Sequence, residues 1–246
     1  MFFDGVILLI IGFLFFKLNF PPNLLLWSLV VGLLYALGGI VYFSVLKLKD
    51  VSQVIPFSQS SEILLIFLGS LLLFNEIANV PNYIGVVLIL IGVYAVLSET
   101  SFKRPRIDKA FYLLLGVVVI NVFFWLLVKK LLYDVQPIAL AITMYFATTI
   151  IMILYQALFN RKALKALTRI NHEISKIGIA SLFGAMGTLL IFFALTLGDA
   201  SKVYPVAGSQ AVFVFVIASA FLKEKFRWHR LIGTIIVFAG IFLISL

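Results

Sequence analysis

The sequence predicts an all-α integral membrane protein with about nine transmembrane helices arranged in two inverted repeats. Of its 246 residues, 63% are hydrophobic and 12% are charged, whereas a soluble domain is roughly 45–50% apolar. The apolar residues form runs long enough for helices that cross a bilayer. In addition, the segment DVSQVIP at 50–56 returns as DASKVYP at 199–205. Such a repeat inside a very apolar chain is typical of transporter folds.

Nine segments meet the requirement of about 20 apolar residues for roughly 30 Å of hydrocarbon. They are 5–20, 25–46, 51–74, 82–98, 110–132, 137–157, 177–198, 203–222 and 231–246. Proline, asparagine, aspartate and charge clusters separate them, as expected at helix ends. Pro56 and Pro205 fall near the first turns of their segments and predict a modest kink in each helix.

The links between the segments define the predicted organisation. Only the links 99–109 and 159–176 exceed a few residues, and neither is long enough to fold as a separate domain. We therefore expect a first half of four helices at 1–99, a cytoplasmic link at 100–109 and a second half of five helices at 110–246. The functional residues must then lie within the membrane.

The basic residues predict the orientation of the chain. Alternating links place 15 of the 19 Lys and Arg residues on one side, which is expected to be cytoplasmic. These residues are Lys47, Lys49, Lys103, Arg104, Arg106, Lys109, Arg161, Lys162, Lys165, Arg169, Lys176, Lys223, Lys225, Arg227 and Arg230. With nine helices, the N-terminus is then cytoplasmic and Leu246 lies outside. The predicted location is the cell membrane.

Each copy of the repeat continues to a glutamate, Glu76 or Glu224. The chain crosses the membrane five times between the two, so the copies must point in opposite directions. The charges agree, because the link 75–82 has no Lys or Arg and the link 223–230 has four. Both glutamates lie at helix ends, where we expect them to cap the following helix or to pair with basic neighbours.

Glycines follow each glutamate at a fixed spacing. Gly85 and Gly92 follow the first glutamate, and Gly233 and Gly240 follow the second. A seven-residue spacing places small residues on one face of a helix, which favours close helix packing over ligand contact. A homodimer contact through these helices is a further expectation.

These residues resemble the EamA branch of the drug/metabolite transporter superfamily. The resemblance is carried by Pro56, Glu76, Gly85 and Gly92 in the first half, and by Pro205, Glu224, Gly233 and Gly240 in the second. It implies ten helices, five in each half, and the export or import of small metabolites. This chain lacks the first of those helices in its first half. Either that helix is absent or the sequence is truncated at its N-terminus.

Glu62 is the principal candidate for function. It lies near the middle of the third segment, where a carboxylate costs roughly 2.5–3.5 kcal/mol on insertion scales. No Lys or Arg is expected at its depth, which suits proton coupling or the recognition of a cationic ligand. Two structural alternatives stay open: a protonated Glu62 that hydrogen-bonds a neighbouring helix, or a Glu62 that faces an aqueous vestibule.

Other polar residues lie at corresponding places in the two halves. Ser58 and Gln59 share the helix face of Glu62, and Ser209 and Gln210 follow Pro205 by one turn. They predict a shared site near the middle of the membrane. Hydrogen bonds that hold helices together are the alternative.

Aromatic residues give a weaker signal. Tyr35 and Tyr42 share a helix face, and Asn121 with Trp125 forms an i, i+4 pair in the fifth segment. They are candidates to line a site for a planar or cationic solute. Contact with lipid is the alternative, because the chain has 25 Phe and nine Tyr residues.

Several classes of function are excluded. The net charge of +9 comes from short links, so it does not indicate nucleic-acid binding. Cysteine is absent, and His172 and His229 have no second ligand at a convincing spacing, so no metal site is expected. A Walker-type phosphate loop and an assembly of nucleophile and base are also lacking. We therefore expect no enzyme and no cofactor.

The sequence thus predicts a secondary transporter of a small organic metabolite or drug-like solute, which works by alternating access and couples to protons through Glu62 or runs on the solute gradient alone. Its expected partners are the small-molecule substrate and the lipid bilayer. Two alternatives remain, a flippase for lipids or lipid-linked sugars and a non-transporting partner subunit. A flippase predicts co-purified lipid, and a subunit predicts no flux until another chain is added.

Overall fold

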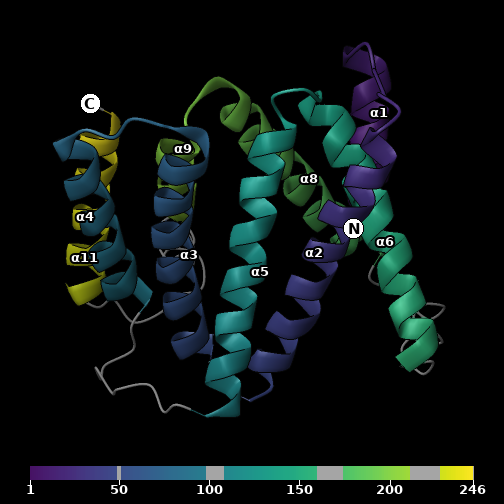
Figure 1. Cartoon of the computed structure of the whole chain (residues 1–246). Helices are drawn as coiled ribbons and strands as arrows, with labels where there is room; N and C mark the ends of the chain where they lie inside the picture. The colour runs from purple at the N-terminus through teal and green to yellow at the C-terminus, as the bar shows by residue number, and fades with distance from the viewer. Residues whose placement is uncertain (49–50, 98–107, 160–173, 211–227, 246) are drawn as a thin grey trace. The chain divides into compact units, whose positions relative to one another are not determined.

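The computed structural model describes residues 1–48, 51–97, 108–159, 174–210 and 228–245 (Figure 1). All regular secondary structure in these residues is α-helical. The helices are α1 (Phe2–Phe15), α2 (Leu24–Leu46), α3 (Val51–Phe74), α4 (Val80–Leu97), α5 (Lys109–Leu131), α6 (Pro137–Phe159), α8 (Ile174–Leu197), α9 (Ala200–Gly208) and α11 (Trp228–Ser245). Each overlaps a helix predicted from the apolar runs.

The largest differences from the predicted bounds are at the first and eighth predicted helices. The prediction of 5–20 is wrong at its C-terminal end, because α1 stops at Phe15 and Phe16 is extended with φ −130° and ψ 146°. The chain must turn before Pro21-Pro22, and a residue that precedes proline disfavours the helical conformation. The prediction of 203–222 begins too late, since α9 starts at Ala200. The helix also ends at Gly208, far short of the predicted end, and residues 211–227 lie outside the described residues.

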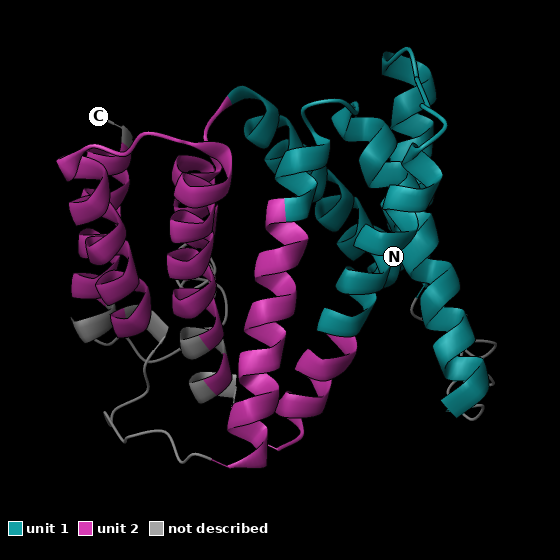
Figure 2. Ribbon diagram, in the orientation of Figure 1, with its two compact units in different colours: residues 1–38, 127–197 teal, residues 39–126, 198–246 magenta. Residues whose placement is uncertain are grey.

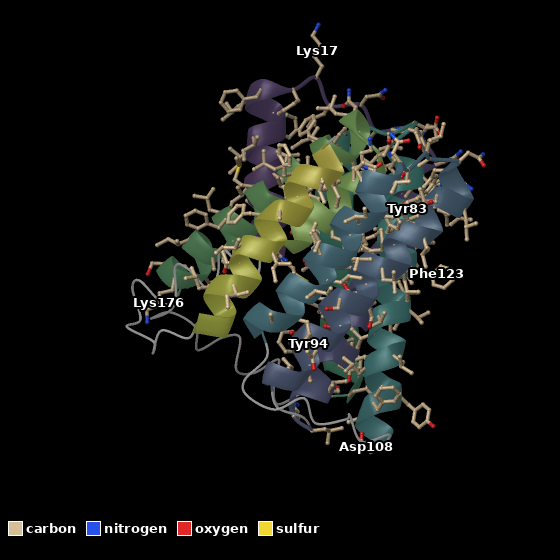
Figure 3. The ribbon with its side chains drawn as sticks, turned by 90° about the vertical axis from the view of Figure 1, so that its left-hand side faces the viewer. Lys17, Tyr83, Tyr94, Asp108, Phe123 and Lys176 are labelled. Atoms are coloured by element: carbon tan, nitrogen blue, oxygen red, sulfur yellow. The ribbon has the colours of Figure 1, made fainter. Side chains whose placement is uncertain are left out.

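The helices have the length and surface of membrane-spanning elements. Four are long and apolar enough to cross a bilayer by length and composition, namely Leu24–Leu46, Lys109–Leu131, Pro137–Phe159 and Ile174–Leu197. Large apolar side chains are exposed on them. Phe123 on α5 is 63% exposed and extends away from the helices around it (Figure 3). Apolar exposure on this scale is what lipid contact requires, so the chain is a helical, multi-pass membrane protein.

The helices form two compact units (Figure 2). Unit 1 contains residues 1–38 and 127–197, and unit 2 contains residues 39–126 and 198–246. The predicted halves, 1–99 and 110–246, each contribute segments to both units. The compact units therefore do not follow the order of the sequence.

Unit 1 is built around α1, which packs on α6 and α8. The first part of α2 approaches α6 closely, since a Cβ added at Gly32 would lie 2.9 Å from the Ala147 Cβ atom. The Ser28 hydroxyl donates to Thr143 Oγ1 at 2.6 Å between the same two helices. Hydrogen bonds between membrane helices contribute about 0.6 kcal/mol each, so this bond adds modestly to the close packing of the two helices.

Unit 2 contains the two glycine-bearing helices, α4 and α11, side by side (Figure 1). A Cβ added at Gly85 would lie 2.7 Å from the Gly240 carbonyl oxygen, and one at Gly92 would lie 2.7 Å from the Gly233 carbonyl oxygen. The helices are therefore antiparallel. The first glycine of each pair meets the second glycine of the other, as two inverted copies of one motif require. Within this chain the stripes serve close helix packing.

Asn82 joins the start of α4 to the end of α11. Its Oδ1 atom accepts a hydrogen bond from the Asn79 N–H at 2.8 Å, and its Nδ2 atom donates to the Ile244 carbonyl at 3.1 Å. Both partners are backbone groups at helix ends, which the helices cannot satisfy themselves.

Replacing Asn82 with Ala should therefore lower the free energy of unfolding by about 1–3 kcal/mol, because two buried backbone groups lose their partner. The measurement is a denaturant titration of the purified protein in detergent micelles. An Asn82→Ala variant as stable as the wild type would contradict this role.

Candidate functional site

Glu62 lies on the buried face of α3. Val54, Ser58 and Glu62 follow one another at intervals of four residues, and all three are buried. Only 8% of the Glu62 surface is exposed. A helix buries residues at this spacing along one stripe, and here the stripe changes from apolar to polar as it approaches Glu62.

Two neutral side chains hold the Glu62 carboxylate. Asn121 on α5 donates from Nδ2 to Oε1 at 2.8 Å, and the Tyr204 hydroxyl on α9 donates to Oε2 at 3.2 Å. Three helices of unit 2 therefore meet at one carboxylate. Among the residues that the structure describes, Glu62 forms no ion pair. Its carboxylate keeps unused lone pairs, which can accept a proton or a cationic group.

Trp125 extends this cluster by one residue. It lies one helical turn after Asn121, and its ring centroid is 5.2 Å from that of Tyr204 at an interplanar angle of 60°. Edge-to-face contacts of this kind contribute roughly 0.5–1.5 kcal/mol. We name Glu62, Asn121, Trp125 and Tyr204 the Glu62 cluster.

The contact of α9 with α3 is close beside this cluster. A Cβ added at Gly208 would lie 2.6 Å from the Ile63 Cδ1 atom. The absence of a side chain at Gly208 therefore lets the two helices approach. As a result Tyr204, one turn earlier on α9, is within reach of Glu62.

The other predicted site residues lie in different surroundings. Ser58 is buried and Gln59 is half-buried on α3. The Ser209 hydroxyl donates to the Val206 carbonyl at 2.5 Å, and Gln210 is exposed. Within the part of the chain that the structure describes, neither Ser209 nor Gln210 hydrogen-bonds Glu62.

Tyr35 belongs to unit 1. Its ring packs edge to face on Tyr145, with centroids 6.3 Å apart. The Tyr145 hydroxyl shares a hydrogen bond of 2.7 Å with Thr188 Oγ1. Tyr35 is therefore part of a separate polar cluster of unit 1.

The two repeated prolines occupy equal places in their helices. Pro56 is the sixth residue of α3, and Pro205 is the sixth residue of α9. Proline removes a backbone donor inside a helix, so the carbonyl four residues earlier loses its partner. In α9 that earlier residue is Ser201, whose buried hydroxyl also has no hydrogen-bond partner.

Glu76 is a capping residue, but for a different helix from the one predicted. Its Oε1 and Oε2 atoms accept hydrogen bonds from the N–H groups of Ala200 and Ser201, each at 2.8 Å. It therefore caps α9 and not the following helix, α4. The N-terminus of α4 is served by Asn82 instead. Glu224 lies outside the described residues.

Sequence reasoning missed two residues. Tyr204 stands where the first copy of the repeat has Ile55, and this change from apolar to polar was the available signal. Asp4 is buried in unit 1, where it accepts a hydrogen bond from the Ser181 hydroxyl at 3.2 Å and pairs with the Met1 amino group. It lies in the first turn of α1, before the first predicted segment begins.

Within the described residues, no group of three or more His, Cys, Asp or Glu side chains is arranged to hold a metal ion. Glu62 and Asp4 are buried in different units. The chemistry available at the Glu62 cluster is proton exchange and cation recognition.

Comparisons with known proteins match this chain to a family of transporters and to two archaeal proteins. Residues 108–246 match the model of the EamA-like transporter family. An uncharacterized transporter of Archaeoglobus fulgidus is 21% identical over 215 residues, which cover 86% of this chain and 72% of that protein. An uncharacterized protein of Methanocaldococcus jannaschii is 31% identical over 68 residues, or 28% of this chain and 50% of that protein.

The fold also has a counterpart among solved structures. One protein of known crystal structure superposes on this chain with a TM-score of 0.75 and is 16% identical in sequence. The superposition covers 99% of this chain and 85% of that protein's chain. At this identity the likeness concerns the fold alone. It extends over both predicted halves, whereas the family model matches the second.

Proposed function

Since this chain belongs to the EamA-like transporter family, we propose that it is a secondary transporter that moves a small organic solute across the membrane by alternating access. The two inverted halves would exchange between states open to opposite sides. The gradient of the solute or of protons would supply the energy. Transport by inverted repeats around a site at mid-membrane is a general solution among secondary transporters.

The Glu62 cluster is the observation that carries this proposal. A buried carboxylate is costly in the membrane, and carboxylates in membrane-spanning helices commonly mark substrate pathways and proton relays. Within the described residues, the hydrogen-bond partners of Glu62 are two neutral donors, and neither cancels the charge of the carboxylate. Such a carboxylate is suited to bind and release a proton, or to exchange a proton for a cationic group of the solute.

The Glu62 cluster also links the protonation of Glu62 to the positions of the helices, as alternating access requires. Its members come from α3, α5 and α9, so any shift of one helix against the others changes the hydrogen bonds of Glu62. Protonation or ligand binding at Glu62 would in turn favour one arrangement of the helices, because coupling between binding and conformation is reciprocal.

We further propose that the chain lies in the cell membrane with a cytoplasmic N-terminus and an external C-terminus. The support is the excess of Lys and Arg in alternate links, 15 of the 19. This orientation places Glu76 and the first turn of α9 toward the outside.

The test is a transport assay on the purified protein in liposomes. Amino acids, amines and sugars are offered as labelled solutes, with and without an imposed pH gradient. We expect one class to enter faster than in empty liposomes, at a rate that the pH gradient changes. Flux no greater than in empty liposomes for all three classes would overturn the proposal.

Tyr204→Phe should slow this transport roughly fivefold, because one hydrogen bond to the Glu62 carboxylate, of about 1 kcal/mol, is lost while the ring contact with Trp125 remains. Tyr112→Phe is the matched control, since Tyr112 lies on the exposed face of α5. The measurement is the initial rate at saturating solute. Equal rates in the two variants would contradict a role for the Tyr204 hydroxyl.

A further inference from the structure

An unbroken series of contacts joins the outer end of α3 to its middle. Glu76, just beyond the end of α3, binds the first turn of α9. One turn later on α9, Tyr204 donates its hydroxyl to Glu62. The path therefore leaves α3 at Glu76, runs through α9 and returns to α3 at Glu62.

The backbone at the end of α3 directs Glu76 to this position. Asn75 has a φ of 52°, the left-handed conformation that ends many helices. Asparagine adopts it more readily than most residues. The chain turns sharply there, so the Glu76 side chain reaches α9 and not the next turn of its own helix.

Glu76 replaces a cap that α9 does not provide for itself. Asp199 is the N-cap residue of α9, yet its side chain makes no capping hydrogen bond. Both oxygens of Glu76 are used instead, one for Ala200 and one for Ser201. Carboxylates are favoured at this end of a helix by its dipole and by its free N–H groups. A remote cap fixes the position of a helix as well as its first turn.

Tyr204 depends on this anchoring. It lies four residues after Ala200, so it is about 6 Å farther along the helix axis and on the same face. Since α9 ends at Gly208, it has only nine residues. Among the described helices, α9 packs chiefly on α3, and this contact sets where its side chains lie.

We propose that Glu76 is a positioning residue that holds the Tyr204 hydroxyl on Glu62 and thereby sets how Glu62 responds to pH and to solute. This inference rests on the proposed function for its role in transport. The local claim, that Glu76 controls the contact between Tyr204 and Glu62, is independent of any solute.

Trp125 provides a readout that needs no transport, because its ring lies against Tyr204. The chain has three tryptophans, so Trp27→Phe with Trp228→Phe leaves Trp125 alone. In this background, Trp125 emission is recorded against pH in lipid nanodiscs. We expect a pH-dependent change that Glu62→Gln abolishes.

Glu76→Gln is the decisive variant. Glutamine has the length of glutamate but carries no charge, and an NH2 donor replaces the second oxygen, so the two-oxygen contact with the N–H groups of Ala200 and Ser201 is lost. We expect the pH-dependent change in Trp125 emission to be lost or displaced, as in Tyr204→Phe. The double variant should add nothing to either single change, since both act through one contact. Glu76→Asp, which keeps the charge, should restore part of the response.

Asn82→Ala is the matched control, because Asn82 also binds backbone groups at helix ends, and its two hydrogen bonds go to Asn79 and Ile244 and not to α9. It should leave the Trp125 response unchanged. A Trp125 response in Glu76→Gln equal to that of the wild type would overturn the inference, because Glu76 would then only cap α9. An equal loss in Asn82→Ala would also overturn it, since general destabilisation would then explain both.

Failure of the inference and failure of the proposed function are distinguishable. If the wild type shows no flux but Glu76→Gln abolishes the Trp125 response, the positioning role stands and the transporter does not. If flux depends on Glu62 but Glu76→Gln leaves the Trp125 response unchanged, the transporter proposal stands and the positioning role does not. For the transport arm, we expect Glu76→Gln to lower the rate at saturating solute by up to about fivefold and to change its pH profile in the same way as Tyr204→Phe.

Discussion

Replacing Glu62 with Gln is expected to lower the transport rate by on the order of tenfold to a hundredfold and to remove its dependence on a pH gradient. Glutamine keeps the shape of glutamate and can still accept a hydrogen bond from Asn121 or Tyr204. It cannot bind a proton in the relevant range or pair with a cation. The substitution therefore removes the charge and leaves the packing of α3 in place.

The free energy of unfolding of Glu62→Gln should be equal to or higher than that of the wild type, although transport is slower. A carboxylate near the middle of a bilayer costs roughly 2.5–3.5 kcal/mol, and a neutral amide costs less. We expect Glu62→Gln to unfold at the same or a higher denaturant concentration than the wild type. A variant that transports at the wild-type rate with the wild-type pH dependence would exclude Glu62 from the mechanism. One that loses activity together with stability would show a structural role.

Gly85→Ala is expected to lower the free energy of unfolding by about 3 kcal/mol, which is near the upper end for a single overpacked site. The new Cβ atom would lie 2.7 Å from the Gly240 carbonyl oxygen and 2.7 Å from Ile244 Cγ1. A backbone oxygen cannot rotate away as a side chain can. The two helices would therefore have to separate along the whole stripe.

Gly116→Ala is the control for this effect. Gly116 lies inside α5, and a Cβ atom there would meet nothing within 4 Å. Alanine is favoured over glycine in a helix by roughly 0.5–1 kcal/mol, so this variant should be equally or more stable. Both are measured by the same denaturant titration in micelles. Similar stabilities for the two alanine variants would show that α4 and α11 do not depend on close backbone contact.

Helix positions could be predicted because hydrophobic length is a local property. The run from 51 to 74 predicts α3 to the residue, and the links rich in proline and asparagine mark where helices stop. Close packing at the glycines was also predictable, because spacing seven residues apart leaves one face without side chains. The helix that packs against that face could not be predicted, because a face of small residues can pack against many different helices.

The candidate site was predictable only in part. Glu62 and Asn121 are unusual enough in apolar helices to be selected from the sequence alone. Tyr204 was not selected, because the change from Ile55 to tyrosine between the two copies is a weak signal in a chain with many aromatic residues. Glu76 was predicted to cap a helix, which is correct, but the helix that it caps is α9 and not α4. Its true partners, Ala200 and Ser201, are more than a hundred residues away.

The sequence by itself determined that this chain is a helical membrane protein with a repeated motif, because burial in lipid constrains every residue of a spanning segment individually. Only the tertiary structure decided that α9 carries Tyr204 to Glu62 and that Glu76 anchors α9. Those contacts depend on the mutual positions of three helices, and many arrangements satisfy the same local preferences. The close approach at Gly208 and the turn at Asn75 select this one.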